Sequence, residues 1–159
     1  PAGAHPSTLL GERSRKISEN LFPIINQVAS GIRDKLLIYG DDWPTNDGTC
    51  IRDYIHVEDL AEGHKAALNY LFGDVQKKFI IINLGNGKGF SVLEIIKAFE
   101  KSCNLKLRTE IVERRKGDVP ELVANVNLAK SILNWEGKRE LKDICQDSWK
   151  FQKKLKINI

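Results

Sequence analysis

The sequence contains no methionine and only three cysteines, and both shortages restrict what the chain can be. Because no methionine opens the chain, we expect it to be a piece of a longer protein. The cysteines, Cys50, Cys103 and Cys145, lie far apart and form no Cys-x-x-Cys pair. This spacing predicts neither a disulfide framework nor a metal site, and we expect reduced thiols in a cytoplasmic protein.

Long apolar runs are missing as well, since none approaches the roughly 20 residues that a membrane-spanning helix needs. We therefore expect no membrane partner. The chain has 159 residues, of which 42% are hydrophobic and 29% are charged, which is typical of one globular unit over residues 1–159. The net charge of +4 permits an anionic ligand but does not require one.

Helical and extended patterns alternate along the chain. The predicted helices span residues 20–31, 57–72, 91–103, 127–134 and 141–151, and the predicted strands span residues 35–40, 77–85 and 106–113. Ser91 and Glu94 form a capping-box pattern at the start of the third helix. The segment 77–85 is apolar at both alternating sets of positions, so we expect it inside a sheet. The pattern predicts an α/β fold, a small mixed sheet with flanking helices.

Two local patterns resemble functional sites but have simpler explanations. A strand, a glycine-rich turn at residues 85–89 and a capped helix could cradle a phosphate, yet the dinucleotide pattern needs a glycine where Phe90 stands. We therefore predict a tight turn without a ligand. His56 and Asp59 could form a hydrogen-bonded pair at a helix start, and we expect this histidine to be structural rather than catalytic.

The arginines are stronger candidates for binding. Arg52 follows the loop 40–49, which is rich in turn-forming residues, and Arg114 and Arg115 open a second charged loop. Arginine grips phosphates through a fork of N–H donors, so the two loops could converge on a diphosphate. Tyr39, at a strand end, could stack on a base. The alternative, that all are solvated surface charges, stays open from spacing alone.

Several long strings resemble one known family. They are "PAGAHPSTLLGE", "NLFPIINQVASG", "LLIYGDDWPTNDGTCIRDYIHVEDLAEGH", "INLGNGKGFSVLE" and "RRKGDVPELVANVNLAKSILNW". Together they cover nearly the whole chain and resemble the C-terminal half of the UDP-glucose 4-epimerase family, which belongs to the extended short-chain dehydrogenases/reductases. The loop string around "WPTNDGTCIRDYIHV" is the most specific of them.

The resemblance implies a reaction and a cofactor. Members of the family interconvert UDP-galactose and UDP-glucose: NAD takes a hydride from carbon-4 of the sugar and returns it to the other face of the 4-keto sugar. In the family, a glycine-rich NAD fingerprint and a Tyr-x-x-x-Lys pair lie in the N-terminal half. Neither pattern occurs in this sequence. We therefore expect no catalytic and no cofactor-binding residue here, and no activity of the chain alone.

The resemblance also implies a substrate grip. Carried over position by position, it gives Asn20 and Leu21 as UDP contacts, Leu37, Ile38 and Tyr39 as the strand against which the uracil lies, Arg52 and Arg115 as diphosphate ligands, Asp118 as a ribose ligand, and Leu122 as a border of the sugar pocket. Leu122 is intermediate in size among family members. Acceptance of N-acetylated UDP-sugars therefore stays open, as does membership of another class of nucleotide-sugar epimerases or dehydratases.

The resemblance finally implies partners. Residues 53–100, with a helix from Val57 and a strand at residues 80–84, are expected to pack on an N-terminal Rossmann half that this chain lacks. Such an exposed apolar edge invites association, including a homodimer. Two readings of another class are a basic nucleic-acid-binding module, suggested by the lysine-rich end, and an interaction domain without a ligand. Basic residues are not clustered with aromatics, so we expect no nucleic-acid partner.

Overall fold

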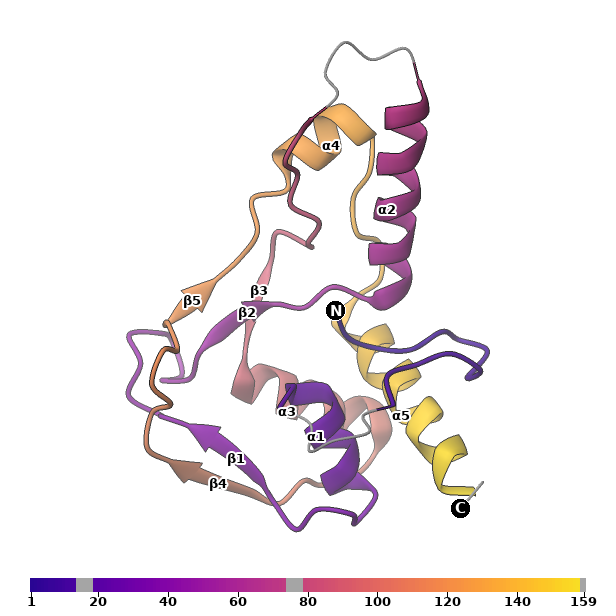
Figure 1. The fold of residues 1–159 in the computed structure, drawn as a ribbon. Helices are drawn as coiled ribbons and strands as arrows, with labels where there is room; N and C mark the ends of the chain where they lie inside the picture. Colours follow the sequence, from indigo (N-terminus) through magenta and orange to yellow (C-terminus); the bar gives the residue numbers. More distant parts are fainter. Residues whose placement is uncertain (14–18, 74–78, 158–159) are drawn as a thin grey trace.

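The computed structural model describes residues 1–13, 19–73 and 79–157, and Figure 1 shows their arrangement. The elements in chain order are α1 (Leu21–Ala29), β1 (Leu36–Tyr39), β2 (Ile51–Asp53), α2 (Val57–Phe72), β3 (Gly89–Ser91), α3 (Val92–Cys103), β4 (Thr109–Val112), β5 (Glu121–Leu122), α4 (Asn127–Leu133) and α5 (Leu141–Ile157). Helices and strands alternate as predicted, so the chain is a small α/β protein.

The strands form two small sheets rather than the single sheet that the sequence suggested. β1 and β4 form a parallel pair. β2 lies between β3, to which it is antiparallel, and β5, to which it is parallel, so this second sheet is mixed. The strands of the second sheet are only two or three residues long, too short to leave a periodic signal in the sequence.

The main core lies where α1, α3 and α5 pack around β1. Phe22 and Ile25 of α1 meet Phe99 of α3 and Ile144 of α5, and all four are buried. Helix α3 presents its apolar face here because Ile95, Ile96 and Phe99 recur at helical spacing. This body, at the bottom of Figure 1, holds α1 and β1 in place. Both elements line the candidate site.

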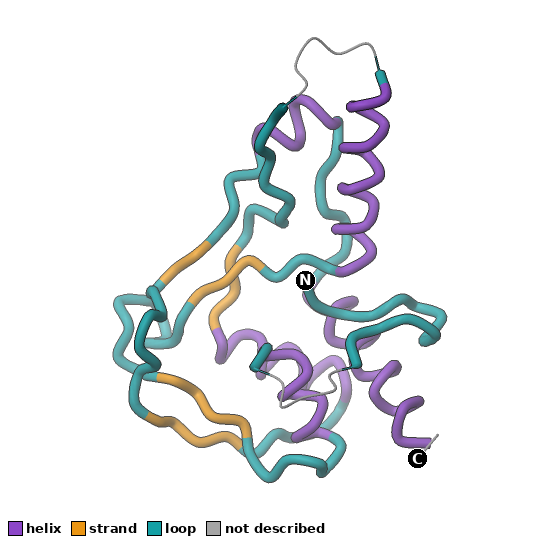
Figure 2. Tube along the Cα trace, in the orientation of Figure 1, coloured by secondary structure: helices purple, strands orange, loops and turns teal. Residues whose placement is uncertain are grey.

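A second, smaller cluster joins α2 to α4. Trp135, Ala129 and Ile55 are buried in it, and Ile82 and Leu84 pack against it. Figure 2 shows the segment that carries Ile82 and Leu84 as a loop rising beside α4, at the upper part of the molecule. The two clusters are connected through the second sheet, which lies between them in Figure 1.

The predicted strand at residues 77–85 is the main wrong expectation. Residues 77 and 78 lie outside the described residues, and residues 79–85 form no strand. Their side chains alternate, with Ile82 and Leu84 packed on the α2–α4 cluster while Phe79 is 81% exposed and Ile81 75% exposed. An extended segment becomes a strand only when its backbone finds a partner, and the described residues supply none here.

The other elements follow the sequence closely. The predicted capping box is confirmed, since Ser91 accepts from the Glu94 N–H and Glu94 accepts from the Ser91 N–H. Helix α2 has the predicted bounds, whereas α5 continues six residues beyond the predicted end at residue 151. Among the described residues, no helix is long and apolar enough to cross a membrane.

Candidate functional site

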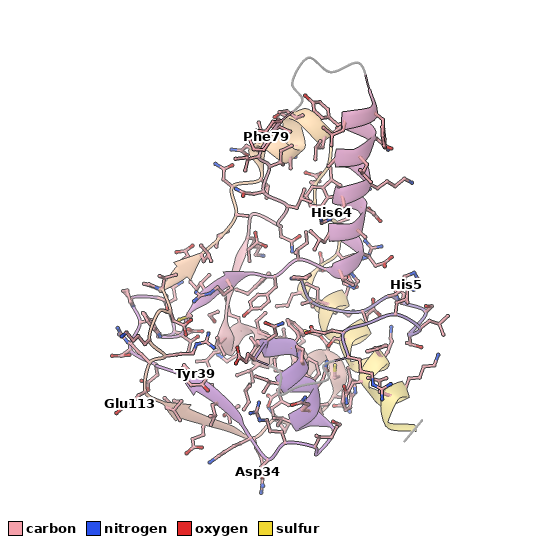
Figure 3. The ribbon with its side chains drawn as sticks, in the orientation of Figure 1. His5, Asp34, Tyr39, His64, Phe79 and Glu113 are labelled. Atoms are coloured by element: carbon pink, nitrogen blue, oxygen red, sulfur yellow. The ribbon has the colours of Figure 1, made fainter. Side chains whose placement is uncertain are left out.

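A cavity of about 330 Å³ lies between the start of α1, the ends of β1 and β2, and the loop that follows β4. These segments are far apart in sequence, and the main core holds them together. The predicted site residues that line the cavity are Asn20, Leu21, Leu37, Tyr39, Arg52, Arg115 and Asp118. Figure 3 shows Tyr39 on β1 in the lower body. The structure therefore brings together residues that the sequence had placed on four separate segments.

Strand β1 explains why Tyr39 reaches the cavity and Ile38 does not. Side chains alternate along a strand, so Leu36 and Ile38 are buried in the core while Leu37 and Tyr39 lie on the more exposed face; Leu36, at the start of the strand, also borders the cavity. Ile38, which was predicted as a uracil contact, is buried in the core and does not line the cavity. Its role there is to anchor the strand that presents Tyr39.

Leu122 also lies outside the cavity. It is on β5, where its backbone is the register partner of Arg52, and its side chain is 64% exposed. The predicted border of a sugar pocket is therefore an open surface next to the cavity, rather than part of its lining.

The loop between β1 and β2 sets the position of Arg52. Asp47 accepts hydrogen bonds from the backbone and the hydroxyl of Thr49 and from the hydroxyl of Ser91, at 3.0, 2.8 and 2.5 Å. Burial alone would raise the pKa of Asp47, but these donors lower it overall. Gly48 has a φ of 79° and lies against the Asp41 backbone, so only glycine fits there. The loop is thereby tied to the start of α3.

Two guanidinium groups meet at one carboxylate in the cavity wall. Arg115 donates to both oxygens of Asp118, at 3.2 and 3.0 Å, and Nη2 of Arg52 lies 3.5 Å from the same carboxylate. Arg52 also donates to the carbonyls of Ile51 and Val119, each at 2.8 Å. The hydrogen bonds that Arg115 donates to Asp118 are the main reason why the pKa of Arg115 is raised. The pair keeps one positive charge in excess of Asp118.

Tyr39 completes this wall. The guanidinium carbon of Arg115 lies 5.4 Å from the centre of the Tyr39 ring, a cation–π contact that fixes the arginine beside an aromatic face. Tyr39 is 39% exposed, so it remains accessible to a flat ligand. An aromatic face, two forked cations and a carboxylate thus border one cavity.

Arg114, the neighbour of Arg115, is not part of the site. Its guanidinium lies 4.2 Å from the Trp43 ring centre and donates to the carboxylate and the carbonyl of Asp42, at 2.6 Å each. The residue pattern offered both arginines as candidates, and the resemblance carried over only Arg115. In the structure Arg114 packs on Trp43 and Arg115 on Tyr39.

Several lining residues were not predicted, among them Glu19, Pro23, Cys50, Asp53 and Tyr54. Position next to a predicted residue was the only available signal for Glu19 and Asp53. Burial raises the pKa of Tyr54 to about 12, so this phenol stays protonated. Its ring packs edge-on against Phe22 at 5.7 Å, which supports a structural role.

Asp53 also binds the backbone of the glycine-rich turn at residues 85–89. Its carboxylate accepts the backbone N–H groups of Asn86 and Gly87, both at 2.9 Å. These are N–H groups that a phosphate would otherwise need. The prediction of a turn without a ligand is therefore consistent with this geometry.

His56 is buried at the start of α2, and its partner differs from the predicted one. The ring is fully buried, its Nδ1 accepts from the Glu58 N–H, and its Nε2 lies 3.5 Å from the Asp147 carboxylate. Asp59, the predicted partner, instead accepts from Arg139. Arg139 lies on the distant segment before α5, which sequence proximity could not reveal.

A larger hollow of about 530 Å³ lies between α1 and α5, but its chemistry fits an anionic ligand less well. Its walls include Phe22, Phe151 and Leu155, and its charged side chains are Glu12 and Arg13, which are opposite in sign. Among the described residues, no cluster of three or more histidine, cysteine, aspartate or glutamate side chains could hold a metal ion.

Comparison with known proteins shows the family to which the chain belongs. The profile of the NAD dependent epimerase/dehydratase family matches residues 2–85. The UDP-glucose 4-epimerase 3 of Oryza sativa is 48% identical over 154 residues, which are 97% of this chain and 41% of the relative. The UDP-glucose 4-epimerase of Yersinia enterocolitica is 50% identical, over 96% of this chain and 44% of the relative. The chain thus spans less than half the length of these relatives.

Solved structures of UDP-glucose 4-epimerases superpose closely on this chain. The UDP-glucose-4-epimerase of Stenotrophomonas maltophila, with bound NAD and formylated UDP-arabinopyranose, superposes with a TM-score of 0.96 at 43% identity, over all of this chain and 47% of that one. The enzyme of Bifidobacterium longum, in complex with NAD⁺ and UDP, gives a TM-score of 0.92 at 40% identity, over all of this chain and 47% of the other.

Proposed function

The chain belongs to the NAD dependent epimerase/dehydratase family, and from this premise we propose that it is the UDP-sugar-binding, C-terminal part of a UDP-glucose 4-epimerase. The whole enzyme would interconvert UDP-glucose and UDP-galactose. The observation that carries the proposal is the cavity in which Tyr39, Arg52, Arg115 and Asp118 converge from separate elements.

The chemistry of the cavity suits a uridine diphosphate. A planar base stacks on an aromatic ring, which Tyr39 offers. A diphosphate needs cations with several N–H donors, which Arg52 and Arg115 offer from two sides. A ribose diol donates hydrogen bonds to a carboxylate, and Asp118 lies between the two arginines. Asn20 and Leu21, at the start of α1, would close the cavity over the nucleotide.

The glycine-rich turn at residues 85–89 does not fit the diphosphate of NAD. The glycine-rich turn at residues 85–89 has already committed its N–H groups to Asp53, and Phe90 replaces the glycine that the dinucleotide pattern needs. We therefore place the NAD site, and the catalytic Tyr-x-x-x-Lys pair, in a part of the enzyme outside this chain. NAD would supply the transient oxidation at carbon-4. The residues here would bind the nucleotide and orient the sugar towards it.

The same proposal assigns a partner to the upper part of the molecule. Phe72 is 86% exposed and Phe79 is 81% exposed, and Figure 3 shows Phe79 beside α4, at the end of the molecule away from Tyr39. Exposed apolar side chains on neighbouring elements mark a surface that another part of a protein covers. We propose that α2 and residues 79–84 pack on the cofactor-binding part, within the predicted range 53–100.

Two finer questions belong to this proposal. Leu122 is exposed beside the cavity, which leaves room for a sugar with an N-acetyl group, so a UDP-N-acetylhexosamine is the alternative substrate. Titration with UDP-glucose and UDP-N-acetylglucosamine separates the two. A nucleic-acid-binding module, the alternative of another class, would bind duplex DNA with a steep salt dependence.

The proposal is tested by titrating UDP into the chain and into an Arg52→Ala variant by isothermal calorimetry. We expect weak binding by the unchanged chain. Loss of Arg52 should weaken it about tenfold to a hundredfold, since hydrogen bonds to charged groups contribute about 1.5–3 kcal/mol each.

Arg108→Ala is the matched control for this experiment. Arg108 is an exposed arginine paired with Asp34 at 2.8 Å, and it does not line the cavity. Its loss removes the same charge and should leave the UDP affinity nearly unchanged. Equal affinities in the Arg52→Ala variant and the unchanged chain would remove Arg52 from the diphosphate role.

A further inference from the structure

The charges around the nucleotide cavity do not sum in favour of an anion. Its lining contains two guanidinium groups and three carboxylates, which are Arg52, Arg115, Glu19, Asp53 and Asp118. The side chains that line it therefore carry one more negative than positive charge, and the amino terminus at Pro1, which also borders the cavity, brings the sum only to zero. A site that takes a diphosphate by charge attraction alone would not be built this way.

Two of the three carboxylates are already satisfied. Asp118 is held by Arg52 and Arg115, at 3.5 Å and at 3.0 to 3.2 Å. Asp53 accepts backbone N–H groups from Asn86 and Gly87. Because both carboxylates are engaged, their charges are partly offset before any ligand arrives.

Glu19 differs from both. It directly precedes Asn20, the N-cap of α1, and it is exposed. Among the described residues it has no hydrogen-bond or ion-pair partner. It lines the cavity with Arg115 and Tyr39, and the same three residues line an adjoining hollow of about 300 Å³. After Asp118, which has the larger effect, Glu19 helps to raise the pKa of Arg115, so the two side chains sense each other.

We propose that Glu19 is a specificity determinant of this cavity: its unpaired carboxylate disfavours nucleotides that carry a free terminal phosphate and so favours nucleotide-sugars. The inference rests on the proposed function and states which nucleotides the same cavity prefers, according to their charge. Glu19 touches no ligand in this account. Its carboxylate repels ligand phosphates at a distance, and Arg115 contributes to the same electrostatic field.

The selection follows from ligand charge. Each phosphate of a nucleotide-sugar has one ester bond and shares the anhydride bond, so the two carry about two negative charges in all. A terminal phosphate carries about 1.5 to 2 by itself, so UDP carries about three and UTP about four. Repulsion from a fixed carboxylate grows with that charge. Among the charged ligands, Glu19 therefore weakens the binding of UDP-glucose least and that of UTP most, and it does not affect uridine, which is neutral.

The test compares Glu19→Gln with the unchanged chain, using uridine, UDP-glucose, UDP and UTP as ligands in low salt. Glutamine keeps the size of the side chain and removes the charge. Two charges roughly 8 Å apart in water change affinity by about two- to threefold per unit of ligand charge. We expect affinity gains of about fivefold for UDP-glucose, tenfold for UDP and twentyfold for UTP, and none for uridine.

Two controls make the result specific. Glu140→Gln removes one negative charge from an exposed glutamate outside the cavity and should change no affinity. Ionic strength near 1 M should remove most of the gain in Glu19→Gln, because salt screens exposed charges.

Three results would overturn the inference. Equal gains for all three nucleotides, or no gain for any of them, would show that Glu19 does not select by charge. Weaker binding of uridine by Glu19→Gln would show that Glu19 contacts the nucleoside directly. If neither protein binds any of the four ligands, the proposed function itself fails, and the inference fails with it.

Discussion

At the scale of single residues, the candidate site depends on which acid or aromatic ring each arginine contacts. Asp118 holds Arg52 and Arg115 together, whereas Arg114 turns away to Trp43 and Asp42. The sequence could predict that arginines near residue 115 matter, because the resemblance carried them. It could not predict which aromatic ring each guanidinium would cover, since that depends on contacts between segments about 70 residues apart.

His56 leads to a prediction at this scale about pH. Burial is the main cause that lowers its pKa, Arg139 adds to it, and Asp147 and Asp59 oppose it. The unfolded chain then binds the proton more readily than the folded one, so the contribution of His56 to stability is complete above about pH 6.5 and is lost as the pH falls through its lower folded pKa. The free energy of unfolding should decrease from about pH 7 to about pH 5, as measured by urea unfolding with tryptophan fluorescence.

A His56→Asn variant is the control for this pH dependence. Asparagine can still accept from the Glu58 N–H at the start of α2, but it does not titrate. The variant should lose most of the slope between about pH 7 and pH 5. The account of His56 is wrong if the variant keeps the slope of the unchanged chain.

At the scale of elements, the long periodic helices were predictable and the short strands were not. The bounds of α2 and the capping box of α3 follow from local residues, so sequence alone gave them. Strands β2, β3 and β5 depend on partners more than 30 residues away, and their two or three residues carry no pattern of their own. The strand prediction for residues 79–85 was wrong for the opposite reason. Its apolar pattern is that of a strand, but the described residues offer no partner strand for it.

At the scale of the whole molecule, the apolar side chains divide into two groups. Those of the main cluster are buried in the core of the lower body, while Leu68, Leu71, Phe72, Phe79 and Ile81 are exposed together at the outer end of α2 and on the segment beside it. Other exposed apolar side chains, such as Leu9, Ile32 and Ile111, lie on separate segments. The candidate cavity therefore lies at one end of the molecule, and the uncovered apolar surface lies at the other. The proposed cofactor-binding part would cover that surface.

The uncovered surface predicts self-association of the isolated chain. Phe79 and Ile81 alternate along an extended segment with no partner strand among the described residues, which is the arrangement that promotes pairing between copies. Sedimentation velocity should show dimers or larger species whose share rises with concentration. Phe79→Lys together with Ile81→Lys should shift the population to monomer without reducing UDP affinity.

The matched control places lysine at two other exposed apolar positions, Leu9 and Leu10, in the N-terminal segment, which lies far from the outer end of α2 and from residues 79–81. That variant should associate as the unchanged chain does. A monodisperse monomer of the unchanged chain at all concentrations would contradict the proposal that α2 and residues 79–84 form a covered interface in the enzyme.

The central claim is that uridine diphosphate binds where α1, β1, β2 and the loop of Arg115 meet, and an NMR titration of the ¹⁵N-labelled chain with UDP tests it most directly. The account predicts chemical-shift changes at Asn20, Tyr39, Arg52, Arg115 and Asp118, which saturate together with a single dissociation constant. Changes confined to the turn at residues 85–89, or to the hollow between α1 and α5, would contradict it. So would a spectrum that UDP leaves unchanged.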